Sequence, residues 1–167
     1  MRTGRFGPAP YQHFNANRAR VRAGGLAGTA KAVGVWWVEE HDRYEMFYRC
    51  GSNSLCVAYS DDAIVWTKPM LDNGFKSCGG AACNMVVETG GIGNSAVWLD
   101  LDTSNSSRRY VLAASHSKID FYTSATGTKF RYEVSSSAVE DCTTIYKDKL
   151  RNKWVYSIKA SGPKSSP

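Results

Sequence analysis

The feature that most limits the fold of this chain is a series of short apolar and aromatic runs separated by clusters of Gly, Asn, Asp and Ser. Runs of this length between turn residues are typical of antiparallel β-strands, and a helical period is hard to find anywhere in the chain. We expect nine strands, at residues 35–39, 44–49, 55–60, 84–88, 96–100, 110–115, 119–123, 143–147 and 153–159. The sequence therefore predicts an all-β protein.

These runs also repeat along the chain. The hairpin patterns RYEMFYRC with LCVAYS and RRYVLAAS with KIDFYTS are followed by similar exits, which begin at Ser60 and Ser124, 64 positions apart. A third partial copy pairs AVWLDLDTSNSSRRYVLAAS with TTIYKDKLRNKWVYSIKAS. Repeated strand units that cannot bury both faces alone stack against like neighbours, as propeller blades do. We predict a fragment of an antiparallel β-propeller, about two to three blades, over residues 35–163.

Each exit carries an aromatic side chain and turn residues at matching places. We expect Trp66 and Phe130 to pack between sheets, because a recurrent aromatic at one repeat position is usually part of the core. Asp61 or Asp62 and Gly127 are expected to shape the turns, the acids through side-chain hydrogen bonds and the glycine through a positive φ.

The charge distribution argues against a nucleic-acid partner. The chain has 167 residues and a net charge of +6, yet residues 1–38 contain six Lys and Arg and no acid, which accounts for the whole excess. Phosphate binding needs a clustered basic surface, which the balanced remainder does not offer. We expect residues 1–34 to be disordered or an atypical start, with a targeting segment as the alternative, and residues 164–167 to be a tail.

No apolar run approaches the length needed to cross a bilayer, and no apolar segment typical of a secretory signal is present. We therefore expect a soluble protein without a membrane partner, in a compartment that the sequence leaves open.

The five cysteines give two candidate disulfides. Cys50 and Cys56 flank the turn GSNS, and Cys78 and Cys83 flank GGAA, so either pair could be bridged in an oxidising compartment; free thiols are the alternative. No C-x-x-C pair is present, which argues against a metal site. Asn105 begins the glycosylation sequon NSS, which matters only if the chain is secreted.

Two other motifs fail in their context. The run GGIGNSA resembles a dinucleotide fingerprint, but the strand-like AVWLDLD follows it where a helix is required, so we expect no cofactor. Gly93 begins a partial nucleophile elbow in which Val97 replaces the last glycine. His13, His41 and His116 lie in polar or turn-rich surroundings and are expected to be surface or loop residues.

Four segments together resemble the five-bladed propeller superfamily of invertases, levansucrases and arabinanases, especially its uncharacterised glycosyl-hydrolase-like members. They are RYEMFYRC with CVAYSDDAIVWTKP, then CNMVVE, then VWLDLDTSNSSRRYVLAAS, and finally EDCTTIYKDKLRNKWVYSIKASGP. The resemblance implies a five-bladed propeller of which this chain holds a part, and hydrolysis of glycosidic bonds in the intact family.

The resemblance also implies site residues. Asp100 in VWLD is similar to the family's transition-state stabiliser, and Asp141 in DCTTIY to its general acid, with Asp in place of the Glu of invertases. The first-blade nucleophile or base has no counterpart, because no acid precedes Glu39. In a glycan-binding propeller without catalysis, Trp98 and Tyr146 would stack on sugar rings.

Three functions follow from these expectations. The first is a glycoside-hydrolase-like domain that is incomplete and inactive alone, with Asp100 and Asp141 as its remaining site residues. The second is a glycan-binding propeller without catalysis, and the third is a protein-interaction fragment that self-associates through open sheet edges. The partner expected in the first two is an oligo- or polysaccharide.

Overall fold

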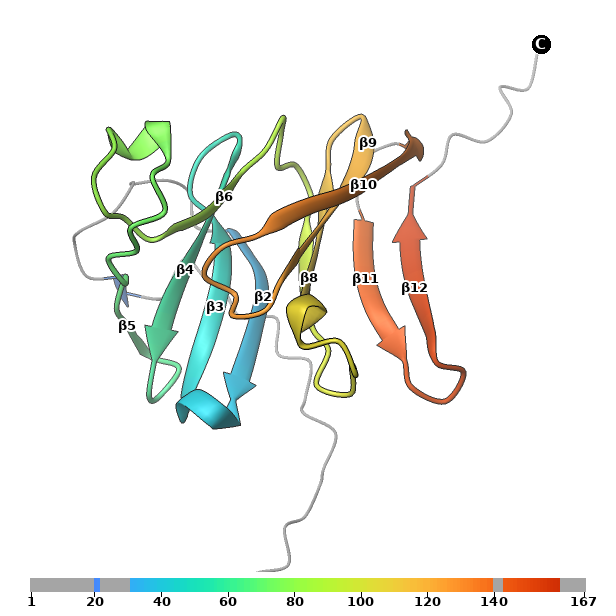
Figure 1. The fold of residues 1–167 in the computed structure, drawn as a ribbon, viewed down its shortest axis with the longest axis horizontal. Coiled ribbons are helices and arrows are strands. Elements are labelled where there is room, and N and C mark those ends of the chain that lie inside the picture. The colour runs from blue at the N-terminus through green and yellow to red at the C-terminus, as the bar shows by residue number, and fades with distance from the viewer. Residues whose placement is uncertain (1–19, 22–30, 140–142, 160–167) are drawn as a thin grey trace, which may run out of the picture.

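The protein consists of three antiparallel β-sheets that follow one another along its long axis (Figure 1). The computed structural model describes residues 20–21, 31–139 and 143–159. Within these residues the helical segments are short 3-10 turns, at Glu39–His41, Lys76–Cys78 and Ser106–Arg108, and there is no α-helix. The all-β prediction is confirmed.

Sheet 1 contains β2 (Lys31–Val38), β3 (Arg43–Arg49), β4 (Ser54–Ser60) and β6 (Met85–Glu88), in that spatial order. Its central strands are apolar on both faces, because both faces are covered. Phe47 pairs with Val57 on one face, and Met46 pairs with Ala58 on the other. All four side chains are buried, in two different core clusters.

Sheet 2 contains β7 (Ala96–Leu99), β8 (Tyr110–Ser115), β9 (Lys118–Ser124) and β10 (Arg131–Ala138), again in chain order. Every residue of β8 is buried. Leu112 belongs to the core shared with sheet 1, whereas Val111 belongs to a second core that includes Ile145. Sheet 2 is therefore the middle layer of the three.

Sheet 3 is the hairpin of β11 (Thr143–Asp148) and β12 (Lys153–Ile158), paired without a register shift. A short parallel pair of β1 (Arg20–Val21) with β5 (Val65–Trp66) completes the strands. None of the helical segments described is long and apolar enough to cross a membrane.

The first strands of the three sheets lie side by side, β2 against β7 and β7 against β11. The contact between β2 and β7 depends on Gly34, since a Cβ at that position would lie 2.8 Å from the carbonyl oxygen of Val97. Trp36 adds a hydrogen bond from Nε1 to the same oxygen, at 3.3 Å. Side-chain packing and this bond are among the contacts that hold the two sheets together.

All nine predicted strands are present, and the structure adds three that were not predicted. Two of these are the two-residue β1 and β5; the third is β10, whose side chains are mostly exposed and therefore lack an apolar pattern. The predicted first strand begins at Lys31 instead of residue 35.

Phe130 packs between sheets 1 and 2, as predicted. Trp66 is buried, but it packs on the other face of sheet 1, against residues of that sheet and its loops, and not between two of the three sheets. Asp62 shapes its turn, because its Oδ1 accepts hydrogen bonds from the N–H groups of Ile64 and Val65, both at 2.8 Å. Gly127 has a φ of 73°.

Both candidate disulfides are formed, Cys50 with Cys56 and Cys78 with Cys83. The first closes the turn between β3 and β4 inside the core of sheet 1, and the second closes the loop that leads to β6. The fifth cysteine, Cys142, lies outside the described residues. Disulfides persist in oxidising compartments, so the pair favours an extracellular or otherwise oxidising location.

Candidate functional site

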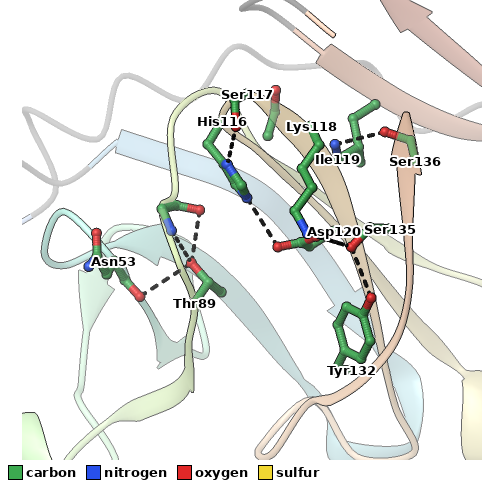
Figure 2. Close-up of polar contacts among 12 residues, drawn as sticks. Asn53, Thr89, His116, Ser117, Lys118, Ile119, Asp120, Tyr132, Ser135 and Ser136 are labelled. Atoms are coloured by element: carbon green, nitrogen blue, oxygen red, sulfur yellow. Dashed lines mark hydrogen bonds and ion pairs between the residues drawn. The ribbon is translucent and has the colours of Figure 1, made fainter. Parts of the chain in front are cut away.

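A cluster of polar side chains surrounds Asp120 beside the turn between β8 and β9. Figure 2 shows His116, Lys118, Ser135 and Tyr132 pointing toward this carboxylate and toward one another. Asp120 Oδ2 lies 3.1 Å from His116 Nε2, and Oδ1 lies 3.2 Å from Lys118 Nζ and accepts a hydrogen bond of 2.5 Å from Ser135 Oγ. Ser135 Oγ in turn lies 2.9 Å from the Tyr132 hydroxyl. We call these five residues the Asp120 cluster.

The Asp120 cluster lies at the rim between sheets 1 and 2. Asp120 pairs across the ladder with Ala114, which belongs to the core between these two sheets. The connection from β6 to β7 runs past the same turn, where the Gly93 N–H donates to the carbonyl of Ser115 at 2.8 Å. Thr89 on this connection donates a hydrogen bond to the carbonyl of Asn53 in the turn between β3 and β4, as Figure 2 shows. The five residues of the cluster thus all belong to sheet 2 and its β8–β9 turn, and the connection from sheet 1 runs beside them.

Burial and hydrogen bonding act in opposite directions on Asp120. Burial raises the pKa of its carboxyl group, but the hydrogen bonds from Ser135, His116 and Lys118, with the charge of Lys118, lower it more, so the pKa lies below the usual value. The carboxylate is thus held ionised, with Lys118 and the half-buried His116 as its neighbours. Asp120 itself is 6% exposed, so the groups of the cluster that can bond a ligand are the more exposed Lys118 ammonium and Tyr132 hydroxyl.

The lowered pKa of Asp120 predicts a pH-dependent stability term. Because the folded pKa is below the unfolded one, the stabilisation is complete above the unfolded value of about 3.9 and is lost as pH falls through the folded pKa. We expect Asp120→Asn to lower the free energy of unfolding by about 1 to 2 kcal/mol at neutral pH and by less below about pH 4. Urea unfolding of both proteins across this pH range measures the difference; a difference independent of pH would contradict the assignment.

A second network is built on Glu45 of β3, which is 1% exposed. Its Oε1 lies 2.8 Å from His41 Nδ1 and 2.9 Å from Arg43 Nη2, and its Oε2 accepts a hydrogen bond of 3.0 Å from the Tyr110 hydroxyl of β8. Burial and the charge of Glu45 raise the pKa of Tyr110 well above its ordinary value. Arg43 also lies over the ring of Tyr59, 3.5 Å from its centroid. This network joins sheet 1 to sheet 2 and is closed to a ligand on the Tyr110 side.

The predicted sugar-stacking residues occupy two different environments. Trp98 packs against Trp36 in an edge-to-face contact, with ring centroids 4.9 Å apart, and faces the core between sheets 2 and 3. Tyr146 occupies the corresponding place on β11, directly after Ile145, which faces sheet 2 as Val97 faces sheet 1, and it is 43% exposed. Trp98 thus fills an interface between sheets, whereas Tyr146 remains open to a ligand or to a further packing partner.

Asp100 is buried at the end of β7, where its carboxylate shapes the following turn. Its Oδ1 accepts a hydrogen bond of 3.2 Å from the Asp102 N–H. Asp148 ends β11 in the same way, with its Oδ1 accepting 3.1 Å from the Arg151 N–H. The counterpart of Asp100 in sheet 3 is therefore Asp148, whereas Asp141 lies outside the described residues.

The turn that follows Asp100 lies near the end of β11, not its beginning. Asp102 Oδ2 is 2.6 Å from Nζ of Lys149, in the turn between β11 and β12. At about 3.3 Å per residue, the six-residue β11 places its first residue roughly 16 Å from that turn. That Asp141 and Asp100 belong to one site stays a prediction, because Asp141 lies outside the described residues.

The Asp120 cluster was not predicted from the sequence. His116 was expected in a loop, and it does lie in the β8–β9 turn, but its ion pair with Asp120 was not predicted. The available signal was the pattern H-x-K-x-D across a tight turn, which becomes meaningful only with the register of β9 and β10. No group of three or more His, Cys, Asp and Glu side chains in the described part of the chain is arranged to hold a metal ion.

The chain matches no protein-family model, no curated protein and no solved structure.

Proposed function

We propose that this chain is a carbohydrate-binding part of a β-propeller, of the glycoside-hydrolase-like type that its sequence resembles. The observation that carries the proposal is the Asp120 cluster, a partly exposed group of donors and acceptors at the rim between two sheets. Glycosidic bond cleavage is the second candidate, and it depends on Asp141.

The arrangement of the sheets supports a propeller. Each sheet is an antiparallel meander in chain order, and its first strand lies beside the first strand of the next sheet. The sheets stack face to face through apolar clusters, one between sheets 1 and 2 and another between sheets 2 and 3. Blades around a propeller axis pack in this way. Sheet 3 would be the inner half of a third blade.

The chemistry of the Asp120 cluster suits sugar hydroxyl groups. A sugar hydroxyl both donates and accepts hydrogen bonds, so it can pair with the exposed Lys118 ammonium and the Tyr132 hydroxyl, which the buried Asp120 holds directly and through Ser135. The Tyr132 ring is 52% exposed and offers an apolar face beside these polar groups. A site with an apolar surface and a few convergent polar groups is typical of small-ligand recognition.

Binding is favoured over hydrolysis by the position of Asp100. A carboxylate that accepts a hydrogen bond within its own turn and is 6% exposed is engaged in local structure. Cleavage requires two carboxyl groups facing one glycosidic bond. Among the described residues, Asp100 has Asp148 as its repeat counterpart, and that residue is engaged in its own turn and in an ion pair with Arg151.

The test is binding of the purified chain to a panel of immobilised oligosaccharides that includes fructans and arabinans. We expect Asp120→Asn to weaken binding about tenfold, which is about 1.4 kcal/mol, because it removes the charge that holds Lys118 and, through Ser135, the Tyr132 hydroxyl in place. Tyr132→Phe should weaken it less. The matched control is Tyr156→Phe, which removes an exposed hydroxyl from β12 outside the Asp120 cluster and should leave binding unchanged.

Two results would overturn this proposal. Absence of binding across the panel excludes a carbohydrate partner of the classes tested, and unchanged binding in Asp120→Asn excludes the Asp120 cluster as the site. Release of reducing sugar by the wild type that stops in Asp141→Asn would establish hydrolysis in place of simple binding. Circular dichroism of each variant shows that a loss of binding is not a loss of fold.

A further inference from the structure

The loop from Asp100 to Arg109 presents the sequon Asn105-Ser106-Ser107 at the surface. All three residues are exposed, and the 3-10 turn Ser106–Arg108 begins directly after Asn105. No other asparagine of the 167-residue sequence is followed by Ser or Thr two positions later. Asn-x-Ser/Thr is the acceptor sequence for asparagine-linked glycans in secreted proteins.

The geometry of the sequon leaves the amide nitrogen accessible. Asn105 Oδ1 accepts hydrogen bonds from the Ser107 N–H at 3.1 Å and from the Ser107 hydroxyl at 2.7 Å. These bonds occupy the carbonyl side of the amide, whereas Nδ2 has no hydrogen bond to any described residue. The asparagine and the hydroxyl residue of the sequon are thus already in contact in the folded chain, with the reacting nitrogen on the solvent side.

The loop is held in place without burying the sequon. Asp102 pairs with Lys149 at 2.6 Å, and Arg109 Nη1 lies 2.8 Å from the carboxylate of Glu40. The Asp100 N–H also donates to the carbonyl of Arg109 at 2.7 Å, which closes the base of the loop. The tip that carries Asn105 is left exposed.

The two disulfides supply an independent reason to place the chain in a compartment where such glycans are attached. Two pairs out of five cysteines are bridged at short sequence separation, 6 for Cys50–Cys56 and 5 for Cys78–Cys83. Structural disulfides are rare in the cytosol and frequent in proteins that pass through the endoplasmic reticulum.

We propose that Asn105 is a glycosylation site. The donor is an oligosaccharide carried on a polyprenyl pyrophosphate. In the transfer, Nδ2 of Asn105 forms a bond to the anomeric carbon of the first sugar, and the bond from that carbon to the phosphate oxygen breaks. The amide nitrogen loses one proton to a base of the transferase, and the lipid pyrophosphate leaves with the electron pair. No atom is oxidised or reduced.

The test is expression of the full chain with an appended secretion signal in a eukaryotic host. We expect a secreted species whose mass falls by that of one glycan after treatment with a peptide N-glycosidase. This enzyme leaves an aspartate where the glycan was attached, so mass spectrometry of the peptides identifies the position. Secreted wild type with no glycosidase-sensitive species would overturn the proposal.

Three variants separate the sequon from the fold. Ser106→Pro abolishes the acceptor, which excludes proline at its middle position, yet it places proline at the first residue of a 3-10 turn after an extended Asn105, where proline is tolerated. It should be secreted without a glycan. Asn105→Gln should also lose the glycan, whereas Ser107→Thr keeps the hydroxyl and should retain it. A glycosidase-sensitive Asn105→Gln or Ser106→Pro protein would contradict the assignment.

Discussion

Replacement of Glu45 by alanine is expected to lower the free energy of unfolding by about 3 kcal/mol, since it removes one partner of a buried charged network. The Tyr110 hydroxyl donates a hydrogen bond of 3.0 Å to Glu45, and without Glu45 it would lose this acceptor in the core between sheets 1 and 2. Arg43 and His41 are 29% and 37% exposed, so water can replace part of what they lose. The expected loss is therefore at the lower end of the range for buried ion pairs. Urea denaturation followed by tryptophan fluorescence measures it.

Tyr110→Phe is the matched control for this prediction. It removes the hydroxyl donor but keeps the ring that packs on Phe47, so we expect a loss of about 1 to 2 kcal/mol. The loss of unfolding free energy in the double variant should be smaller than the sum of the two single-variant losses, because both changes remove the same hydrogen bond. A loss below about 1 kcal/mol for Glu45→Ala would mean that the network contributes little to the packing of the two sheets.

Replacement of Gly127 by alanine is expected to cost about 2 to 4 kcal/mol, from two causes that add. Gly127 has a φ of 73°, which a residue with a Cβ adopts only at a cost. The added Cβ would also lie 3.0 Å from Phe47 Cζ and 3.1 Å from two atoms of the Tyr110 ring. Both rings are buried, so neither can move aside without disturbing the core. Thermal and urea unfolding would measure the loss.

Gly74→Ala separates the two causes. Gly74 has a similar φ of 69°, but no atom lies within 4 Å of the Cβ it would gain. We expect this variant to lose only the backbone contribution, about 1 kcal/mol. Equal losses in the two variants would show that the rings near Gly127 accommodate the methyl group and that packing there is not tight.

The strands could be predicted from the sequence where their side chains are buried. The runs around Phe47 and Leu112 are apolar because sheets cover them on both faces, and such runs are visible without a structure. β10 could not be predicted, since it lies at the edge of sheet 2 with Tyr132 and Val134 exposed. A strand that gains its stability from ladder hydrogen bonds and not from burial leaves little pattern in the sequence.

The candidate site could be predicted only in part, for a different physical reason. Asp120 and Ser135 are far apart in sequence and meet because β9 and β10 pair in a particular register. Glu45 stands in RYEMFYR like any polar residue of an alternating strand, and its contact with Tyr110 exists only because sheet 2 packs on sheet 1. Asp100 was correctly placed at the end of a strand, but its engagement in a turn needed coordinates.

The contacts of β2 with β7 and of β7 with β11 arrange the three sheets as a row of layers, with sheet 2 in the middle. In such a row the cooperativity of folding depends on the interfaces between layers. Sheet 2 packs against a sheet on each face, so both interfaces depend on it. Sheet 3 has one described neighbour and exposes Tyr146 on its other side. A destabilising mutation at the interface of sheets 2 and 3 would thus allow the β11–β12 hairpin to unfold separately from the other two sheets. A destabilising mutation at the interface of sheets 1 and 2 would allow sheet 1 to unfold separately from sheets 2 and 3.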